Sequence, residues 1–231
     1  MVNLPDLDLV FSVDDVLRGQ GADPAALRRR SPTLVKTAER AIEEGQPLLQ
    51  PEVYCQEFQV ESLQHEKLNL SGGGWLGGRL IVQHLVKAIK VYVFLCTIGG
   101  KLERRVSELI ATDMVYALAL DGVGSVAVES LANAACKYIE DAACSQGMPA
   151  SIPLSPGMVG WPVEDGQPQI FSLLGEKQDS VRLTPSYVML PRKSLTMVLG
   201  VGPELETMGR TCDYCTLRET CRYQDHYLNS T

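Results

Sequence analysis

The longest helical pattern in the chain runs from residue 113 to residue 143, and its interior contains Gly122 and Gly124. Two interior glycines lower the stability of a helix by about 2 kcal/mol relative to alanine. Close packing must offset this loss, and small side chains continue the narrow surface beside the glycines: Ala117, Ala119, Ala127, Ala132, Ala134 and Ala135. The pattern therefore predicts a long core helix with a strand or a second helix packed closely against its glycine face.

Shorter helices are predicted before this core helix. Two N-cap residues are each followed by proline, at Asp23-Pro24 and Ser31-Pro32, which predicts helices over 24–30 and 32–44. Ser12 can cap another short helix before them. We expect residues 1–50 to form an N-terminal helical arm.

The middle of the chain mixes strand and helix patterns. Strands are predicted over 53–60, 67–70 and 91–96, helices over 79–88, 101–110 and 167–174, and a hairpin of 187–190 with 194–199, turned by Pro191-Arg-Lys. Because no regular strand–helix–strand alternation is present, the pattern indicates an α+β fold over residues 51–205. Residues 206–231 are then a cysteine-rich tail.

Composition narrows the class of protein. The chain has 231 residues, 45% of them hydrophobic, and can bury a substantial core. Its net charge of −7 argues against non-specific nucleic-acid binding, which needs a basic surface. We read no membrane-length apolar run and no signal peptide, so we expect a cytoplasmic protein.

Two features in the first half of the chain resemble functional motifs only weakly. The run Ser71-Gly-Gly-Gly-Trp-Leu-Gly-Gly78 lacks the lysine of a phosphate-binding loop, so we interpret it as a turn. His84 has no second histidine or carboxylate at ligand spacing, and we interpret it as an ordinary packed or surface histidine.

The segment Pro153-Leu-Ser-Pro-Gly-Met-Val-Gly-Trp-Pro162 contains three prolines and two glycines in ten residues. Proline fixes φ and removes a donor, whereas glycine frees φ, so neither a helix nor a strand fits there. The composition predicts an ordered loop that is either an elaborate connection or a binding surface.

The tail places three cysteines within ten residues, at Cys212, Cys215 and Cys221. Two thiolates in a Cys-x2-Cys spacing can bind one metal ion or neighbouring irons of a cluster, and the third is within reach. His226 could complete a Cys3His zinc site. Alternatively, a [4Fe–4S] cluster could take its fourth ligand from the other cysteines, which are Cys55, Cys96, Cys136 and Cys144. An exposed tail with unpaired thiols is the remaining alternative.

Several motifs together resemble one known family. They are Cys96-Thr-Ile-Gly-Gly-Lys-Leu-Glu103, Ala119-Leu-Asp-Gly-Val-Gly-Ser125 with Glu129, Ser155-Pro-Gly-Met-Val-Gly-Trp-Pro162, Phe171-Ser-Leu-Leu174 and Leu183-Thr-Pro-Ser-Tyr-Val-Met-Leu-Pro191. In this order they resemble the activation domain of cobalamin (vitamin B12)-dependent methionine synthase, most closely its short free-standing relatives. The resemblance covers roughly residues 50–200.

The resemblance implies a C-shaped α+β domain with a bent, largely antiparallel sheet. In that family the domain docks on the cobalamin module when the cofactor is oxidised to cob(II)alamin. A low-potential donor such as flavodoxin or ferredoxin reduces the cobalt, and S-adenosylmethionine bound to the domain methylates it. The domain binds and orients, and the corrinoid carries out the chemistry.

The family's ligand loop runs arginine, any residue, alanine or serine, proline, glycine, tyrosine. Here Ser155, Pro156 and Gly157 match, but Pro153 stands at the arginine position and Met158 at the tyrosine position. Proline offers no charged fork for a carboxylate. We therefore expect the loop to face a corrinoid or a partner protein rather than S-adenosylmethionine.

Two aromatic residues complete the predicted site. Tyr187 is expected to line the same pocket as Ser155 and Gly157. Trp161 either contacts the corrinoid or packs beneath the loop, and we favour packing.

The leading hypothesis is a free-standing factor that docks on a corrinoid methyltransferase and aids cob(II) reduction. Its role would be redox or reactivation rather than homocysteine methylation. An electron relay through an iron–sulfur cluster in the tail is favoured over zinc, because zinc has no redox role. The alternatives are a non-catalytic docking module with a zinc-stapled tail and an S-adenosylmethionine-binding domain.

Overall fold

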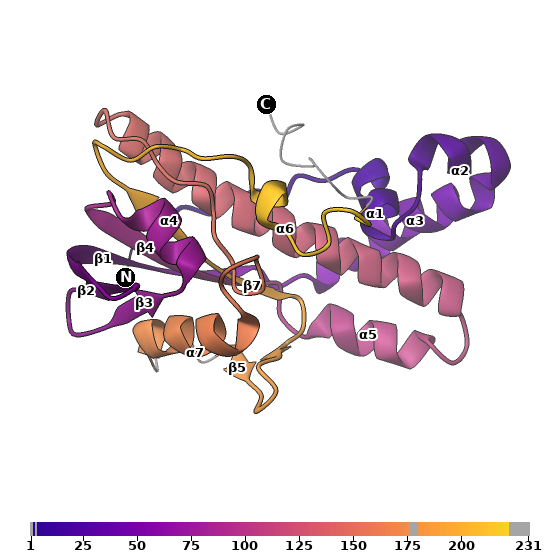
Figure 1. The fold of residues 1–231 in the computed structure, drawn as a ribbon. Helices are drawn as coiled ribbons and strands as arrows, with labels where there is room; N and C mark the ends of the chain where they lie inside the picture. Colours follow the sequence, from indigo (N-terminus) through magenta and orange to yellow (C-terminus); the bar gives the residue numbers. More distant parts are fainter. Residues whose placement is uncertain (1, 3, 176–179, 222–231) are drawn as a thin grey trace.

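A five-stranded antiparallel sheet with the order β3-β2-β1-β4-β7 lies at one end of the molecule (Figure 1). The computed structural model describes residue 2 and residues 4–175 and 180–221. The strands are β1 (Glu52–Gln64), β2 (Lys67–Leu70), β3 (Trp75–Gly77), β4 (Lys90–Thr97) and β7 (Ser194–Val201). The outer edge of β7 is covered by bridges from Ala150 to Val201 and from Leu154 to Val198.

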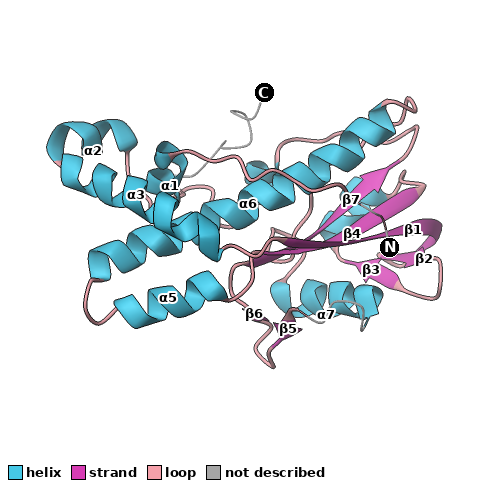
Figure 2. Cartoon of the chain, turned by 180° about the vertical axis from the view of Figure 1, so that it is seen from behind, coloured by secondary structure: helices cyan, strands magenta, loops and turns pink. Residues whose placement is uncertain are grey.

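One face of this sheet is covered by α6 (Met114–Cys144) and the helices that pack on it. The long helix α6 spans the molecule from the sheet to the helical end (Figures 1 and 2). Against it pack α1 (Val13–Gly19), α3 (Pro32–Gly45) and α5 (Lys101–Leu109), and α2 (Pro24–Arg30) packs on α3. The N-terminal helices thus share a hydrophobic core with α6 and with sheet residues such as Phe94, Cys96 and Met197.

The glycines of α6 lie where other side chains approach. A Cβ at Gly124 would lie 2.6 Å from Leu102 Cδ2 of α5, and one at Gly122 would lie 3.0 Å from Gln20. The prediction of close packing at these glycines is confirmed. The helix is long and apolar enough to cross a membrane, but 61% of its most apolar window is buried inside the protein.

A second hydrophobic core occupies the opposite face of the sheet. Helices α4 (Arg79–Leu85) and α7 (Val163–Leu174) pack there, together with the fully buried side chain of Trp161. The same cluster includes Val93, Leu95 and Val198, which alternate along their strands with the residues of the first core. The sheet therefore separates two cores, and the predicted α+β fold class is confirmed.

The predicted hairpin of 187–190 with 194–199 is wrong. β7 pairs along its whole length with β4, from Ser194 opposite Thr97 to Val201 opposite Lys90. The segment before it forms only a short ribbon of β5 (Arg182–Leu183) with β6 (Met189–Leu190). Tyr187 adopts a φ of 62°, which interrupts an extended backbone. Apolar β7 instead gains a full-length partner in the buried strand β4.

Among the described residues, the 3-10 helices are η1 (Gln46–Leu48) and η3 (Thr211–Tyr214). The first joins the N-terminal helices to β1. The second lies in the cysteine-rich tail.

Candidate functional site

The Pro153–Pro162 segment is an ordered loop closed by its own backbone hydrogen bonds. The Gly157 N–H donates to Trp161 O at 2.8 Å, and the Trp161 N–H donates to Met158 O at 3.0 Å. Gly157 and Gly160 have φ values of 100° and 92°, which side chains rarely adopt. The two glycines therefore allow the sharp reversal that the composition predicts.

Trp161 anchors the loop from below. Its side chain is completely buried, and its indole N–H lies 3.4 Å from Gln169 Oε1 of α7. A Cβ at Gly166 would lie 2.9 Å from Trp161 Cε2, and one at Gly78 would lie 3.0 Å from Trp161 Cδ1. In this conformation Trp161 packs within the core, and its ring does not face a ligand at the surface.

The glycine-rich run after β2 supports the same loop. Gly72 and Gly73 have positive φ values and turn the chain, as expected of a turn. The next residues form β3, and the Gly77 N–H donates to Gln169 Oε1 at 2.9 Å. The Leu80 N–H then donates to Gly160 O at 3.2 Å, which ties the start of α4 to the loop.

The remaining loop residues lie at the surface. Ser155, Pro156, Gly157 and Met158 are half-buried, and Val159 at the apex is 61% exposed. The loop therefore presents a mainly apolar backbone-and-side-chain surface with Val159 at its centre.

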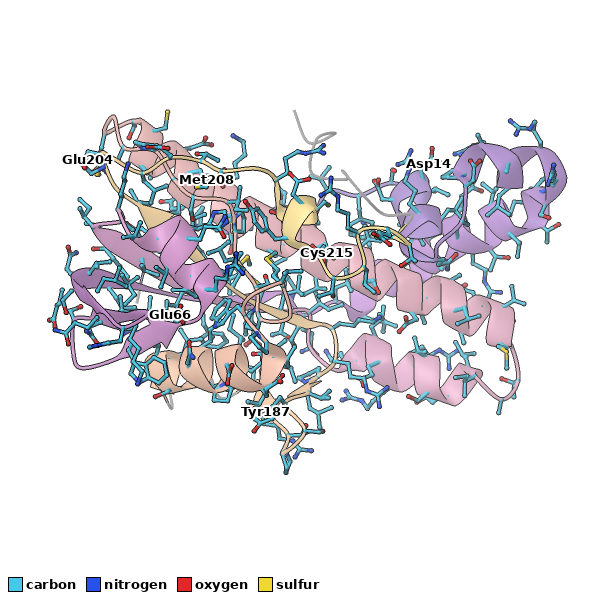
Figure 3. The ribbon with its side chains drawn as sticks, in the orientation of Figure 1. Asp14, Glu66, Tyr187, Glu204, Met208 and Cys215 are labelled. Atoms are coloured by element: carbon cyan, nitrogen blue, oxygen red, sulfur yellow. The ribbon has the colours of Figure 1, made fainter. Side chains whose placement is uncertain are left out.

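Tyr187 lies on a different part of the molecule from the cysteine tail. It sits in the turn between β5 and β6, where its N–H donates to Thr184 O at 2.9 Å, and it is 38% exposed. Figure 3 shows Tyr187 at the outer end of this hairpin, away from Cys215. The structure brings the loop and the tail together and leaves Tyr187 apart from the tail.

The tail packs directly on the loop. The Val159 N–H donates to Tyr214 O at 2.9 Å, so the apex of the loop is bonded to η3. The Tyr214 ring stands edge-on to the His84 ring of α4, with centroids 4.6 Å apart at 88°. Three segments that are distant in sequence therefore meet here: α4, the loop and the tail.

His84 is buried at this meeting point. It is 3% exposed, and neither Nδ1 nor Nε2 has a hydrogen-bond partner within the described ranges. Burial lowers the pKa of the imidazole, so the ring is held neutral. The interpretation of His84 as a packed histidine agrees with its burial. The sequence did not predict that His84 lies against Tyr214 of the tail. The only local signal was its placement on the same helix face as Leu80 and Ile81.

Cys212, Cys215 and Cys221 are each half-buried in the tail. Over residues 4–175 and 180–221, no group of three or more metal-ligating side chains is already gathered. His226, the predicted fourth ligand, lies outside the described residues. The metal predictions for the tail thus stay predictions.

Three of the other cysteines lie on the opposite face of the sheet from Tyr214. Cys55, Cys96 and Cys136 are buried in the core beneath α6, whereas Tyr214 packs on the second core. Burial raises the pKa of the Cys55 thiol to about 12 and that of Cys96 still further, which keeps both protonated. Because the sheet lies between these three thiols and Tyr214, they are not placed to complete a metal site in the tail. Cys144 is exposed at the end of α6.

A cavity of about 590 Å³ lies where the loop begins, between the end of α6 and residues 147–153. Glu140, Asp141, Cys144, Pro153 and Thr207 are among its lining residues. Burial is the main reason why the pKa of the Glu140 carboxyl is raised. The volume suits a small ligand, and the Asp141 carboxylate on its wall is already paired with Lys137 at 3.0 Å. Sequence reasoning missed this cavity because its walls come from three separate segments.

The fold has a counterpart among solved structures. The chain is similar to the crystal structure of the MetH reactivation domain bound to AdoHcy, with a TM-score of 0.61 and 14% sequence identity. The similarity covers 85% of this chain and 77% of that chain. No protein-family model and no curated protein sequence matches the chain. The chain therefore has the fold of the MetH reactivation domain.

Proposed function

We propose that this protein is a cytoplasmic accessory factor for the reductive reactivation of a corrinoid methyltransferase such as methionine synthase. It docks on the cobalamin-bearing protein and positions cob(II)alamin for reduction by a low-potential donor such as flavodoxin or ferredoxin. The observation that carries the proposal is the fold shared with the MetH reactivation domain over 85% of this chain. The ordered series of sequence motifs supports it independently of the fold.

The Pro153–Pro162 loop is the proposed docking surface. Exposed Val159 and half-buried Pro156 and Met158 offer apolar contact, and the fixed loop shape costs little entropy on binding. Ser155, Gly157 and Tyr187 are the other residues that we propose to face the corrinoid or its protein. The chain supplies binding and orientation, and the partner's cobalamin supplies the redox chemistry.

A more specific form of this proposal adds an electron relay through an iron–sulfur cluster in the tail. Such a cluster needs four ligands. Cys212, Cys215 and Cys221 supply three, and the buried thiols lie across the sheet from them. Iron and a visible charge-transfer spectrum after anaerobic reconstitution would support the relay, whereas zinc without visible absorption would favour a docking module with a structural metal.

A second candidate function is binding of S-adenosylmethionine. The solved neighbour was crystallised with AdoHcy, and the cavity beside Pro153 has room for a ligand of that size. Its lining includes the acids Glu140 and Asp141, which suit a sulfonium and an amino group, but no arginine or lysine for the carboxylate. Calorimetry with S-adenosylmethionine tests this candidate, and no heat at millimolar ligand would reject it.

The main experiment measures the anaerobic reduction of cob(II)alamin on a corrinoid protein by a low-potential donor, with and without this protein. We expect the protein to increase the rate and Val159→Asp to abolish most of the increase. Val115→Asp is a matched control, because Val115 is 53% exposed on α6, away from the loop, and Val159 is 61% exposed. No acceleration by the wild-type protein, or equal loss in both variants, would contradict the proposal.

A further inference from the structure

His84 is a buried side chain that lacks the contacts its chemistry requires. Neither ring nitrogen has a hydrogen-bond partner in the described part of the chain, although only 3% of the residue is exposed. Leaving a buried polar group unpaired costs about 1–3 kcal/mol. Such a group in a native structure calls for an explanation, and a bound ion or an ordered water is one.

The segment that faces His84 carries the cysteines. Tyr214 is in edge contact with the imidazole, and Cys212 and Cys215 lie on either side of Tyr214 in the chain. The Cys215 N–H donates to Cys212 O at 3.3 Å, which closes one tight turn between the two thiols. Tyr214 therefore links the imidazole of α4 to the short segment that carries the two thiols, although these are distant in the sequence.

A backbone N–H group beside these thiols can stabilise a negatively charged thiolate sulfur. The Leu217 N–H points at Cys215 Sγ at 3.4 Å, two residues along the chain. Hydrogen bonds of this kind stabilise the charge of a metal-bound thiolate. A further turn, in which the Cys221 N–H donates to Leu217 O at 2.8 Å, holds the third cysteine in the same short segment.

We propose that His84 joins Cys212, Cys215 and Cys221 in a site for a single zinc-type divalent metal ion. Three sulfurs and one imidazole nitrogen form the ligand set of closed tetrahedral zinc sites. The ligand from α4 replaces the tail histidine His226 as the fourth donor.

The four side chains do not yet surround one point, since no group of three is gathered among residues 4–175 and 180–221. Binding therefore includes a local rearrangement of the segment 211–221, in which the Tyr214 ring gives up its edge contact with His84. Metal binding coupled to the ordering of a short segment is common.

A metal ion at this position would fasten the tail to α4 beside the Pro153–Pro162 loop. The apex of the loop is already bonded to this segment through the Val159 N–H and Tyr214 O. The site thus has a structural role at the edge of the proposed docking surface. It does not depend on the proposed function, because a metal-free protein could still dock on a corrinoid protein.

The test is an anaerobic titration of the metal-free full-length protein with Co²⁺, followed by displacement with Zn²⁺. We expect a tetrahedral visible spectrum with a sulfur-to-cobalt charge-transfer band. Cys215→Ser should remove the charge-transfer intensity in part, and His84→Ala should change the visible envelope and weaken zinc binding at least about tenfold. His84→Cys should restore tetrahedral binding with a more intense charge-transfer band.

Two variants serve as matched controls. His65→Ala removes an exposed histidine in the turn between β1 and β2, and Cys144→Ser removes an exposed thiol outside the tail. Both should bind cobalt as the wild type does. Circular dichroism establishes whether each variant is folded. If His84→Ala does not fold, the His84→Cys protein still tests the role of His84.

Three results would overturn the inference. One is the absence of tetrahedral cobalt binding by the wild type. Another is a wild-type spectrum and zinc affinity in both His84 variants. The third is an iron–sulfur spectrum that His84→Ala leaves unchanged. The rate of cob(II)alamin reduction, measured on the same metal-free and zinc-loaded samples, separates failure of the metal site from failure of the proposed function.

Discussion

The two tryptophans of the chain have opposite environments, although each follows or precedes a glycine-rich stretch. Trp161 is fully buried against α7, whereas Trp75 is 39% exposed on β3 with Lys67 over its ring. Replacing a buried tryptophan by alanine removes transfer energy and leaves a cavity. We expect Trp161→Ala to lower the free energy of unfolding by about 3–5 kcal/mol, measured by urea denaturation.

Trp75→Ala is the natural comparison. It removes a partly exposed ring and one cation–π contact, so a loss of about 1 kcal/mol or less is expected. Similar losses for the two substitutions would mean that Trp161 does not anchor the loop.

Glu140 is a residue whose protonation is linked to stability. Burial raises the pKa of its carboxyl in the folded protein, so the stability it contributes is present below its ordinary pKa and is lost as the pH rises through the raised value. We expect Glu140→Gln to raise the urea midpoint at about pH 7.5 and to leave it unchanged at about pH 4. The gain should stay under about 1 kcal/mol, since the group keeps partial contact with water.

Asp141→Asn provides the contrast, because Asp141 is an exposed neighbour paired with Lys137 at 3.0 Å. It should change stability by less than about 0.5 kcal/mol at both pH values. An equal gain in stability for the two substitutions would show that general charge reduction, and not burial of Glu140, is responsible.

At the scale of elements, the two glycines of α6 test how closely the helix is packed. Gly124→Ala gains about 1 kcal/mol of helix propensity, but its Cβ would meet Leu102 Cδ2 at 2.6 Å and the stem of Lys193 at 3.1 Å. Leu102 is fully buried, and the Lys193 ammonium is held by Asp121 at 2.9 Å. We expect a net loss of about 1–2 kcal/mol in the free energy of unfolding.

Gly122→Ala should behave differently, because its neighbours are Cγ and Nε2 of the exposed Gln20 side chain, both at 3.0 Å, and among the described residues that side chain is held only by a 2.9 Å hydrogen bond from Nε2 to Leu118 O. That side chain can move, so the gain in propensity should make the change neutral or stabilising by up to about 1 kcal/mol. Thermal or urea unfolding of the two variants gives the comparison. A stabilising Gly124→Ala would mean that the contact between α5 and α6 is loose.

The contact of the tail with the loop is a second test at this scale. Tyr214→Ala removes the ring that covers His84, and we expect faster amide exchange at Val159, whose N–H donates to Tyr214 O. The free energy of unfolding should fall by about 1–2 kcal/mol. Tyr214→Phe keeps the ring contact and loses only the 3.4 Å hydrogen bond from the hydroxyl to Met208 O, so exchange at Val159 should match the wild type and the free energy of unfolding should fall by no more than about 0.5 kcal/mol. Unchanged exchange at Val159 in Tyr214→Ala would show that the tail does not protect the loop.

An element could be predicted from the sequence when the interactions that form it join residues close together in the chain. Asp23 caps α2 through the Ala25 and Ala26 N–H groups, and Ser12 caps α1 through the Asp15 N–H. These contacts are local, and the predicted helices there are confirmed. The pairing of β7 with β4 joins residues about a hundred positions apart, and the local proline turn at Pro191 suggested the wrong partner.

The same limit applies to the candidate site. The shape of the Pro153–Pro162 loop follows from its prolines and glycines and was predicted. The meeting of His84 with Tyr214 could not be predicted, because nothing near His84 in the sequence carries a ligand pattern. His84 and Tyr214 are more than a hundred residues apart in the chain, and packing on the second core brings them together.

At the scale of the whole molecule, the N-terminal helices and the sheet contribute to one core. Val16, Leu17 and Ala38 are buried against α6 in the same cluster as Phe94 and Cys96. Removing residues 2–45 would expose the apolar face of α6 that these side chains cover. We therefore expect this deletion to abolish the single cooperative unfolding transition of the full-length protein and to increase the binding of a hydrophobic dye.

The tail should be dispensable for folding by the same reasoning. Residues 209–221 contact the second core mainly through Tyr214, which is only partly buried there. Deletion from residue 209 onward should therefore keep a cooperative transition, with a urea midpoint lowered by no more than the Tyr214→Ala change. A cooperatively folded protein after the N-terminal deletion would instead establish that residues 1–50 are an arm separable from the α+β core. Because both truncations are compared with the full chain by the same denaturation experiment, the result decides whether the core extends across α6 or ends at the sheet.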